Sequence, residues 1–240
     1  MDNQQGNLLY LMDKYVKPMA YSIGALTGDG TVKTHIVKRN NSFATIRMVS
    51  LSLMDIDCVE RVCSEINEFF GKSYRVVKYE NPDGTRMYRL AINKKAIYDF
   101  FNYFIGEKLF IRDEIFRADR EARLDYLAGL FDTDGFVSET KHPGAKYGVS
   151  WRVGFASRHR TFVEDVARLL SKIGVKVGKV HEQTSQYDAK IYVIKPNIRS
   201  FVEAGCYFQI PRKAKRLSNY VDAVKPSETI MPSLQRQVKI

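Results

Sequence analysis

Hydrophobic and polar residues follow two periods along the chain, one typical of helices and one typical of strands. Apolar residues three or four positions apart predict helices at 18–29, 55–70, 94–106, 124–134, 160–173 and 196–204. Strict alternation between turn residues predicts strand pairs at 31–38 with 43–53, 73–80 with 85–92, 136–142 with 147–157 and 175–183 with 187–194. The same order of segments therefore occurs twice.

Each half reads as helix, two strands, helix, two strands, helix. Antiparallel sheets with helices on one face belong to the α+β class. We therefore expect an α+β protein built from two αββαββα repeats. The boundary is expected near residue 115, which gives domains at 1–115 and 116–240, the second with a basic C-terminal extension.

A short segment occurs in both halves. Residues 22–30 read Ser-Ile-Gly-Ala-Leu-Thr-Gly-Asp-Gly, and residues 127–135 read Leu-Ala-Gly-Leu-Phe-Asp-Thr-Asp-Gly. In this alignment Gly24 corresponds to Gly129, and small residues at such positions let two helices approach closely. A repeat at about half the chain length indicates a duplicated domain.

Carboxylates lie at the C-terminal end of the second of these helices. Asp132 and Asp134 occupy its last turn, where the negative end of the macrodipole disfavours them. A carboxylate held there indicates a nearby cation, and oxygen ligands favour a hard ion such as Mg²⁺. The alternative is an ordinary helix end with no metal. Because Thr27 takes its place in the first copy, Asp132 is interpreted as structural, bonding across the helix pair.

Composition indicates a polyanionic partner. The 240 residues include 38 Lys and Arg against 27 acids, a net charge of +11, which points most often to nucleic acid. A protein that is merely basic is the alternative. We find no apolar run of the roughly 18 residues that a membrane helix needs and no secretory signal. Three cysteines without zinc-ligand spacing favour an intracellular, reducing location.

The repeated segment resembles a known signature. Leu127 to Gly135 is similar to the motif of the LAGLIDADG homing endonucleases, from which it differs at Phe131 and Thr133. Two copies in one chain resemble the single-chain, pseudo-symmetric members. The resemblance implies a saddle of antiparallel sheets with the two motif helices at the interface. It also implies a monomeric, site-specific endonuclease that makes a metal-dependent double-strand break across the minor groove, leaving short 3′ overhangs.

The resemblance implies catalytic and metal-binding roles for the last acid of each motif. These acids are Asp29 and Asp134, with Gly28 and Thr133 before them as further metal positions. The implied ion is Mg²⁺ or Mn²⁺, with Ca²⁺ as a non-cleaving substitute. Both acids are present, which argues against a loss of catalysis.

Basic residues near the metals are also implied. Arg158 follows the second strand of the second half, and Lys213 lies in the basic run after the last helix, so both are candidate catalytic residues. Simple phosphate contact is the alternative for that run. The first half offers Lys108 or Arg112.

The open face of the sheets is a candidate DNA surface, with an ordinary solvated face as the alternative. The positions expected to point outward are Lys33, His35, Arg39, Ser50, Ser52, Arg86, Tyr88, Ser150, Arg152, Lys179, His181, Gln183 and Lys190. Basic and hydrogen-bonding side chains on strands suit the major groove of double-stranded DNA. Strands of about ten residues at ~3.3 Å each cover about 10 base pairs, so two halves cover about 20.

Other functions stay open at this point. The same fold resembles RNA maturases that help group I introns splice, which would bind intron RNA. It also resembles transcription regulators that have lost the acids. An unrelated basic α+β binding module is a further alternative. An intein-resident enzyme is less favoured, because the sequence has no splicing-type His-Asn terminus.

Overall fold

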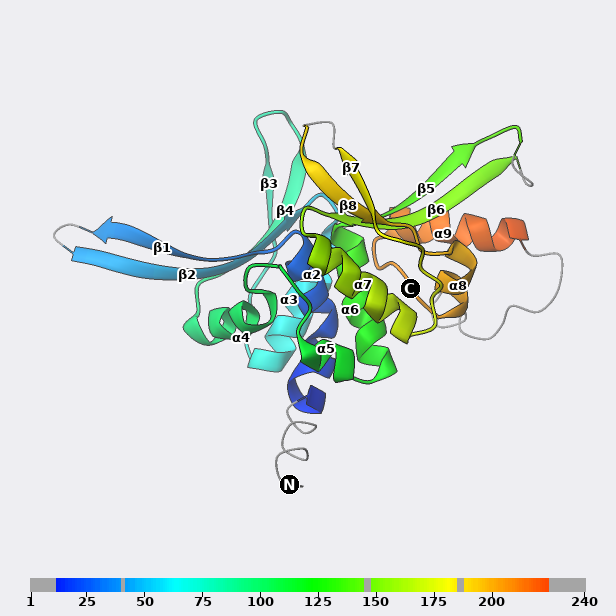
Figure 1. Cartoon of the computed structure of the whole chain (residues 1–240). Helices are drawn as coiled ribbons and strands as arrows, with labels where there is room; N and C mark the ends of the chain where they lie inside the picture. Colours follow the sequence, from blue (N-terminus) through cyan, green and yellow to red (C-terminus); the bar gives the residue numbers. More distant parts are fainter. Residues whose placement is uncertain (1–11, 40–41, 145–147, 185–187, 225–240) are drawn as a thin grey trace, which may run out of the picture. The chain divides into compact units, whose positions relative to one another are not determined.

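The chain folds into two compact units, the first ending at Thr133 and the second beginning at Asp134. The structure is a computed structural model that describes residues 12–39, 42–144, 148–184 and 188–224, without the side chains of Met12, Asp13 and Arg39 (Figure 1). Each unit holds one four-stranded antiparallel sheet with helices on one face.

The first unit contains most of the helices. Its elements are η1 (Met12–Val16), η2 (Lys17–Met19), α2 (Ala20–Gly28), β1 (Thr31–Arg39), β2 (Ser42–Leu53), α3 (Ile56–Phe70), β3 (Val77–Glu80), β4 (Arg86–Ile92), α4 (Lys95–Ile105), α5 (Asp113–Arg117) and α6 (Arg120–Thr133).

The sheet of the first unit has the strand order β1-β2-β4-β3. Val49 lies opposite Ile92, and Leu51 lies opposite Leu90, and all four are buried under the helices. On the same face the Thr34 hydroxyl donates to Tyr98 of α4 at 3.0 Å. Because neighbours along a strand alternate in direction, the residues between these positions form the open face.

Helices α2 and α6 pack against each other at two glycines. A Cβ on Gly24 would lie 2.0 Å from the carbonyl oxygen of Tyr126, and one on Gly129 would lie 2.1 Å from that of Tyr21. Backbone therefore meets backbone, which no larger side chain allows. The close approach expected from the repeated segment is what the structure shows.

A buried hydrogen bond joins the same two helices. The Tyr21 hydroxyl donates to Asp132 at 2.8 Å, and burial is the main cause that raises the pKa of Tyr21. The guanidinium of Arg61 stacks on the Tyr21 ring at 3.9 Å. Nearby, Glu65 of α3 accepts from the backbone and the hydroxyl of Ser22 at 3.0 and 2.7 Å and so caps the first turn of α2. Asp132 thus bonds across the helix pair, as expected from the presence of Thr27 instead of an acid at the equivalent position of the first copy.

The substitution Tyr21→Phe should destabilise the first unit. It removes the donor and leaves the buried Asp132 carboxylate short of one hydrogen bond, which costs about 1–3 kcal/mol of unfolding free energy. Urea unfolding measures the loss. In a double-mutant cycle with Asp132→Leu, the Tyr21→Phe cost should shrink. An unchanged cost in that background would contradict the assigned partner.

The second unit repeats the order of the first. Its elements are β5 (Gly135–Lys141), β6 (Val149–Ser157), α7 (Arg160–Lys172), β7 (His181–Thr184), β8 (Lys190–Ile194), α8 (Ile198–Glu203) and α9 (Pro211–Val224).

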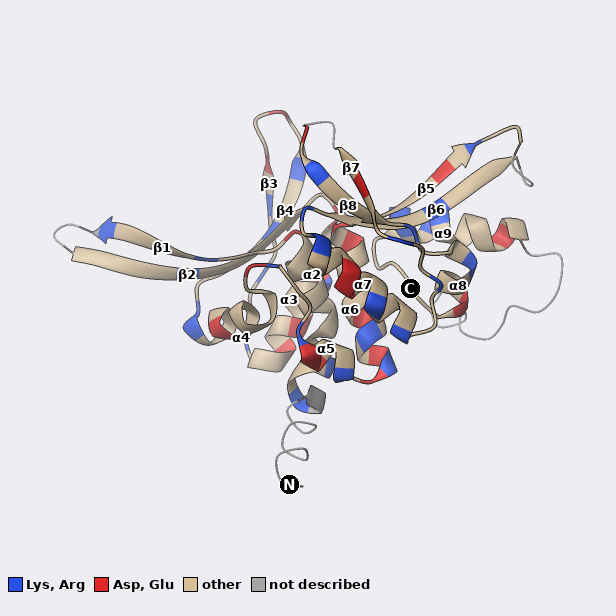
Figure 2. Ribbon diagram, in the orientation of Figure 1, with Lys and Arg blue, Asp and Glu red and all other residues tan. Residues whose placement is uncertain are grey.

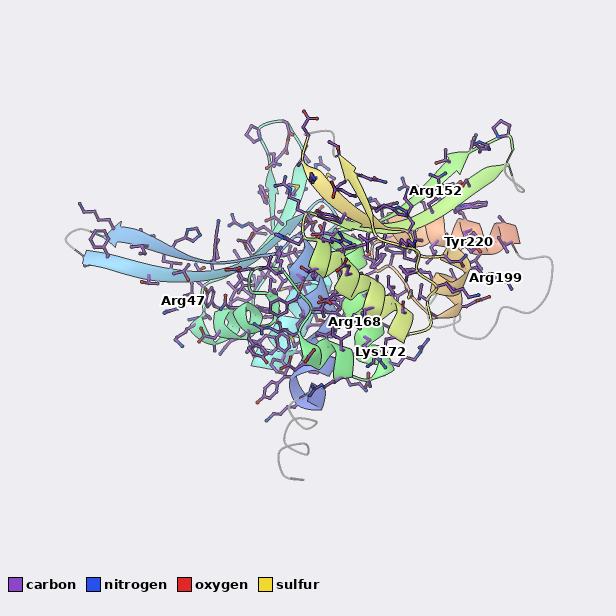
Figure 3. All side chains as sticks on the ribbon, viewed as in Figure 1. Arg47, Arg152, Arg168, Lys172, Arg199 and Tyr220 are labelled. Carbon is purple, nitrogen blue, oxygen red and sulfur yellow. The ribbon has the colours of Figure 1, made fainter. Side chains whose placement is uncertain are left out.

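The second sheet has the order β5-β6-β8-β7. Phe155 lies opposite Ile194, both fully buried, and packs edge to face against Phe162 of α7. Helix α9, which carries Tyr220 (labelled in Figure 3), lies along the β5–β6 ribbon on the same side. The ring centroids of Trp151 and Tyr220 are 5.9 Å apart. As in the first sheet, the residues between these buried positions along each strand form the open face.

The predicted α+β architecture of two αββαββα repeats is confirmed. Three local predictions are wrong: β3 begins only at Val77, β7 begins only at His181, and a short helix, α5, interrupts the expected connection. The stretch before β7 pairs through a single bridge between Val177 and Pro196, which does not extend into a ladder. The unit boundary follows the packing of α6 on α2, and the repeat boundary near residue 115 stays a prediction.

Candidate functional site

An aspartate followed by a glycine ends each of the two packed helices. Asp29 is exposed and forms the C-cap of α2, and Gly30 leads into β1. Asp134 is half-buried and directly follows α6, and Gly135 begins β5. Each carboxylate thus sits where a helix turns into the first strand of a sheet.

A lysine holds the backbone beside Asp29. The ammonium of Lys108, which follows α4, donates to the carbonyls of Gly28 and Gly30 at 2.5 and 2.8 Å. Lys108 has a φ of +57°, an uncommon backbone conformation for a residue other than glycine. The carbonyls on both sides of Asp29 are therefore bound by one positive charge.

A second lysine holds the backbone beside Asp134. Lys213 lies in the first turn of α9 and is only 5% exposed, and its ammonium donates to the carbonyl of Gly135 at 2.6 Å. Lys213 follows Lys108 by 105 residues (213 − 108), and Gly135 follows Gly30 by the same interval (135 − 30). The lysine-to-glycine contact is therefore repeated in register, and the shared spacing was readable in the sequence.

The other basic candidates lie elsewhere. Arg112 donates to the carbonyl of Tyr103 at 2.8 Å and stacks on the Tyr103 and Phe110 rings. Arg158 is exposed between β6 and α7. Of the two residues expected in the first half, Lys108 is thus the one that contacts the end of α2.

Comparison with known proteins identifies chains of similar sequence and fold. Residues 121–204 match the LAGLIDADG-like domain family. The structure of I-DmoI in complex with DNA and Ca superposes with a TM-score of 0.57 at 15% identity, covering 86% of this chain and 99% of that one. I-LtrWI, a LAGLIDADG homing endonuclease bound to target DNA, gives 0.52 at 13% identity over 87% of this chain and 89% of that one.

The chain has the LAGLIDADG fold. A probable translation initiation factor IF-2 of Methanocaldococcus jannaschii is 22% identical over 218 residues, which are 88% of this chain and 17% of that protein. The matched part of this chain thus corresponds to about a sixth of the length of the curated relative. Across the described residues no helix is long and apolar enough to cross a membrane.

The donor groups at the motif ends fit a hard cation. At each motif end, taken by itself, a carboxylate and backbone carbonyls are oxygen ligands of the kind that Mg²⁺ and Ca²⁺ prefer. Among the described residues no three His, Cys, Asp or Glu side chains cluster, so a phosphate or water oxygen must complete any coordination shell. The Gly28 carbonyl already accepts from Lys108, and the Thr133 hydroxyl bonds to Gly129 and Leu130 of its own helix. A ligand role for Thr133 therefore rests on its backbone carbonyl, and one for Gly28 rests on the second lone pair of a carbonyl that already accepts from an ammonium.

Most of the residues expected on the open face of the first sheet lie there. Lys33 lies opposite Met48, His35 opposite Ile46, and Ser52 opposite Arg89, all out of phase with buried Val49 and Leu51. Ser50 shares this face but is only 9% exposed. The side chain of Arg39 lies outside the described residues.

The open face of the second sheet carries polar side chains on its β5–β6 ribbon. Arg152 lies opposite Ser138, and Ser150 lies opposite Thr140 (Figure 3). His181 and Gln183 of β7 share this face, and Lys179 is exposed in the segment before that strand.

The expected outward position is wrong for Arg86, Tyr88 and Lys190. Arg86 and Tyr88 are in phase with buried Leu90, so they lie on the helix side of the first sheet. Lys190 is in phase with Ile194 and pairs with Glu182 at 2.8 Å on the helix side of the second sheet.

The same phase brings an unexpected arginine to the open face. Arg89 is exposed and lies opposite Ser52. The sequence contained this signal. Leu90 and Ile92 are apolar, two positions apart and buried, so they share the helix-covered face, and Arg89, next to Leu90, points to the other face.

The open faces hold no carboxylate among the described strand residues. The acids of these strands, whose ribbon positions are red in Figure 2, are Glu80, Glu139 and Glu182. The strand register puts each of them in phase with the helix-covered side of its sheet. Lys33, Arg89 and Arg152 are not countered there by acids on the same face, which suits a polyanion.

Proposed function

We propose that this chain is a site-specific DNA endonuclease that acts as a monomer and cuts both strands of a target of about 20 base pairs with a divalent metal. Asp29 and Asp134 are the metal-binding carboxylates, and the open sheet faces bind the duplex. The proposal goes beyond the fold, which by itself does not determine activity.

One observation carries the proposal. The arrangement of a helix end, an aspartate, a glycine and a lysine on the glycine carbonyl occurs twice, at Lys108 and at Lys213, at the same interval of 105 residues. A single lysine on the carbonyls of a helix end is common, but the same contact at the same interval in both halves, with Lys213 buried despite the cost of burying a charge, is not expected of two unrelated helix ends. A duplex has two phosphodiester backbones to cut, and the chain offers two equivalent sets of groups.

The chain's own residues would bind the metal ion, orient the groups around it and neutralise charge on the phosphate. When bound, a divalent ion lowers the pKa of its water and stabilises the charge on the leaving oxygen. Asp29 and Asp134 would hold the ion, one carboxylate for each strand. Lys108 and Lys213 fix the glycine carbonyls beside those carboxylates and add positive charge near a phosphate.

The substitution Lys213→Met should reduce cleavage more than stability. Methionine fills a similar volume, so the change removes mainly the hydrogen bond to the Gly135 carbonyl, a net cost of about 1 kcal/mol of unfolding free energy. Loss of a positioned charge should slow cleavage of bound duplex by about 10²-fold. Single-turnover cleavage and urea unfolding measure the two effects. Lys215→Met, at an exposed position of the same helix, is the control and should cut at the parent rate.

Selection from a randomised duplex library with Mg²⁺ tests the function. The proposal predicts that one long sequence is recovered both as bound and as cut on both strands. Recovery of a bound sequence that is never cut, even with Mn²⁺, would favour a regulator of the same fold. No selected duplex at all would contradict the proposal and direct attention to structured RNA.

A further inference from the structure

The outer part of the first open face carries a row of apolar residues along β2, beside Lys33 and His35 of β1, where a solvated ribbon is normally polar throughout. On the β1–β2 ribbon Val37 lies opposite Ala44, His35 opposite Ile46, and Lys33 opposite Met48. Val37 is 38% exposed. Along β2 the three apolar residues, from Ala44 to Met48, span about 13 Å, or about four base pairs.

The equivalent ribbon of the second unit has the opposite character. Its outer pairs are Thr140 with Ser150 and Ser138 with Arg152, all hydroxyls and a guanidinium. The apolar residues of this face, such as Phe136 with its ring over Gly154 and Ala156 opposite Val193, lie at the base of the ribbon. The two ribbons therefore present different chemistry at corresponding positions.

The major groove contains few groups that an apolar surface can recognise. The C5 methyl of thymine is the apolar group of the four base pairs in that groove, and Ala or other apolar side chains contact it. Arginine instead forms paired hydrogen bonds with guanine. The row of Val37, Ala44, Ile46 and Met48 thus discriminates by methyl groups even though Lys33 and His35 lie beside it, whereas the ribbon with Arg152 discriminates by hydrogen bonds alone.

We propose that the two half-sites of the DNA target differ in composition. The half bound by the first unit is thymine-rich over about four base pairs and is read through thymine methyls by Val37, Ala44, Ile46 and Met48. The half bound by the second unit is read through hydrogen bonds, with guanine at Arg152. This inference rests on the proposed function and specifies its substrate.

The alternative explanation is that these residues are apolar only because apolar residues favour strands, which would apply to both faces of the ribbon. A residue on the opposite face therefore serves as the control. Ile36 is 73% exposed, lies opposite Thr45 and points away from the open face. Ile36 and Ile46 therefore have the same side chain on the same ribbon, and only Ile46 should contact DNA.

Replacement of thymine by uracil in the selected target tests the inference. Uracil keeps the base pair and lacks the methyl, so duplex affinity, measured in Ca²⁺ to prevent cutting, should fall about 4-fold for each contacted methyl. Substitution in the thymine-rich half should weaken binding at least 10-fold in total, and substitution in the other half should have no effect. In the Ile46→Ser variant the fall in affinity caused by uracil should be about 4-fold smaller than in the parent, because one methyl contact is already absent. In Ile36→Ser this fall should be the same as in the parent.

The outcomes separate this inference from the function on which it rests. Specific binding and cutting of a duplex whose two halves tolerate uracil equally would overturn the inference and leave the nuclease intact. An equal effect of Ile36→Ser and Ile46→Ser would also overturn it, because then the face is not the determinant. Failure to select any duplex would overturn the proposed function first.

Discussion

Asp29→Asn and Asp134→Asn should each abolish double-strand cleavage while leaving duplex binding nearly unchanged. The amide keeps the size of the side chain and removes the negative charge that would hold a divalent ion. Loss of that charge stabilisation costs roughly 4 kcal/mol in the transition state, or about 10³-fold in rate. Cleavage of the selected duplex in Mg²⁺, followed on each strand separately, measures the loss.

The neighbouring acid is the matched control for these two variants. Asp132→Asn changes a carboxylate two positions from Asp134 that accepts from Tyr21 inside the helix pair. An amide oxygen can still accept that bond, so this variant should cut at close to the parent rate and change mainly stability. Parent-like cutting by Asp29→Asn or Asp134→Asn would contradict the metal-binding role.

Gly24→Ala should cause a large loss of stability in the first unit. The new Cβ would lie 2.0 Å from a backbone oxygen and 3.0 Å from the backbone nitrogen of Leu130, so the two helices must move apart. Overpacking of this kind costs about 3 kcal/mol, or about 6–12 °C in Tm for a chain of this size. Thermal unfolding followed by circular dichroism measures it.

Gly178→Ala is the control for that substitution. A Cβ at Gly178 meets no atom within 4 Å, so the change should shift Tm by at most about 1 °C. If Gly24→Ala were equally neutral, α2 and α6 would not be packed backbone to backbone.

The repeated architecture could be predicted because each element carries its own periodicity. The helix pair was predictable from Gly24 and Gly129, since small residues in matching positions have a direct steric meaning. The hydrogen bond between Tyr21 and Asp132 could only be suspected, because the partner depends on how the helices are rotated against each other. The local hydrophobic pattern therefore predicts the helices and strands, whereas the hydrogen-bond partners depend on how these elements pack.

The errors on the sheet faces have one physical cause. Alternation fixes which residues share a face, and only a buried residue fixes which face that is. For β4 the buried pair Leu90 and Ile92 settles the phase and sends Arg89 outward, whereas Tyr88 follows the core. The late start of β3 is a separate error: its first pair is Val77 with Arg89, although β4 continues to Ile92, so alternation in residues 73–76 did not lead to pairing.

The central claim is that two carboxylates serve two strands of one duplex, and the position of the cuts tests it most directly. The selected target, labelled on either strand, is incubated with Mg²⁺ and with Ca²⁺, and the ends are mapped to the nucleotide. The account predicts one cut on each strand, offset across the minor groove to leave short 3′ overhangs, with Mg²⁺ and none with Ca²⁺. Cutting of a single strand only, or tight binding with no cut in Mg²⁺ or Mn²⁺, would contradict it.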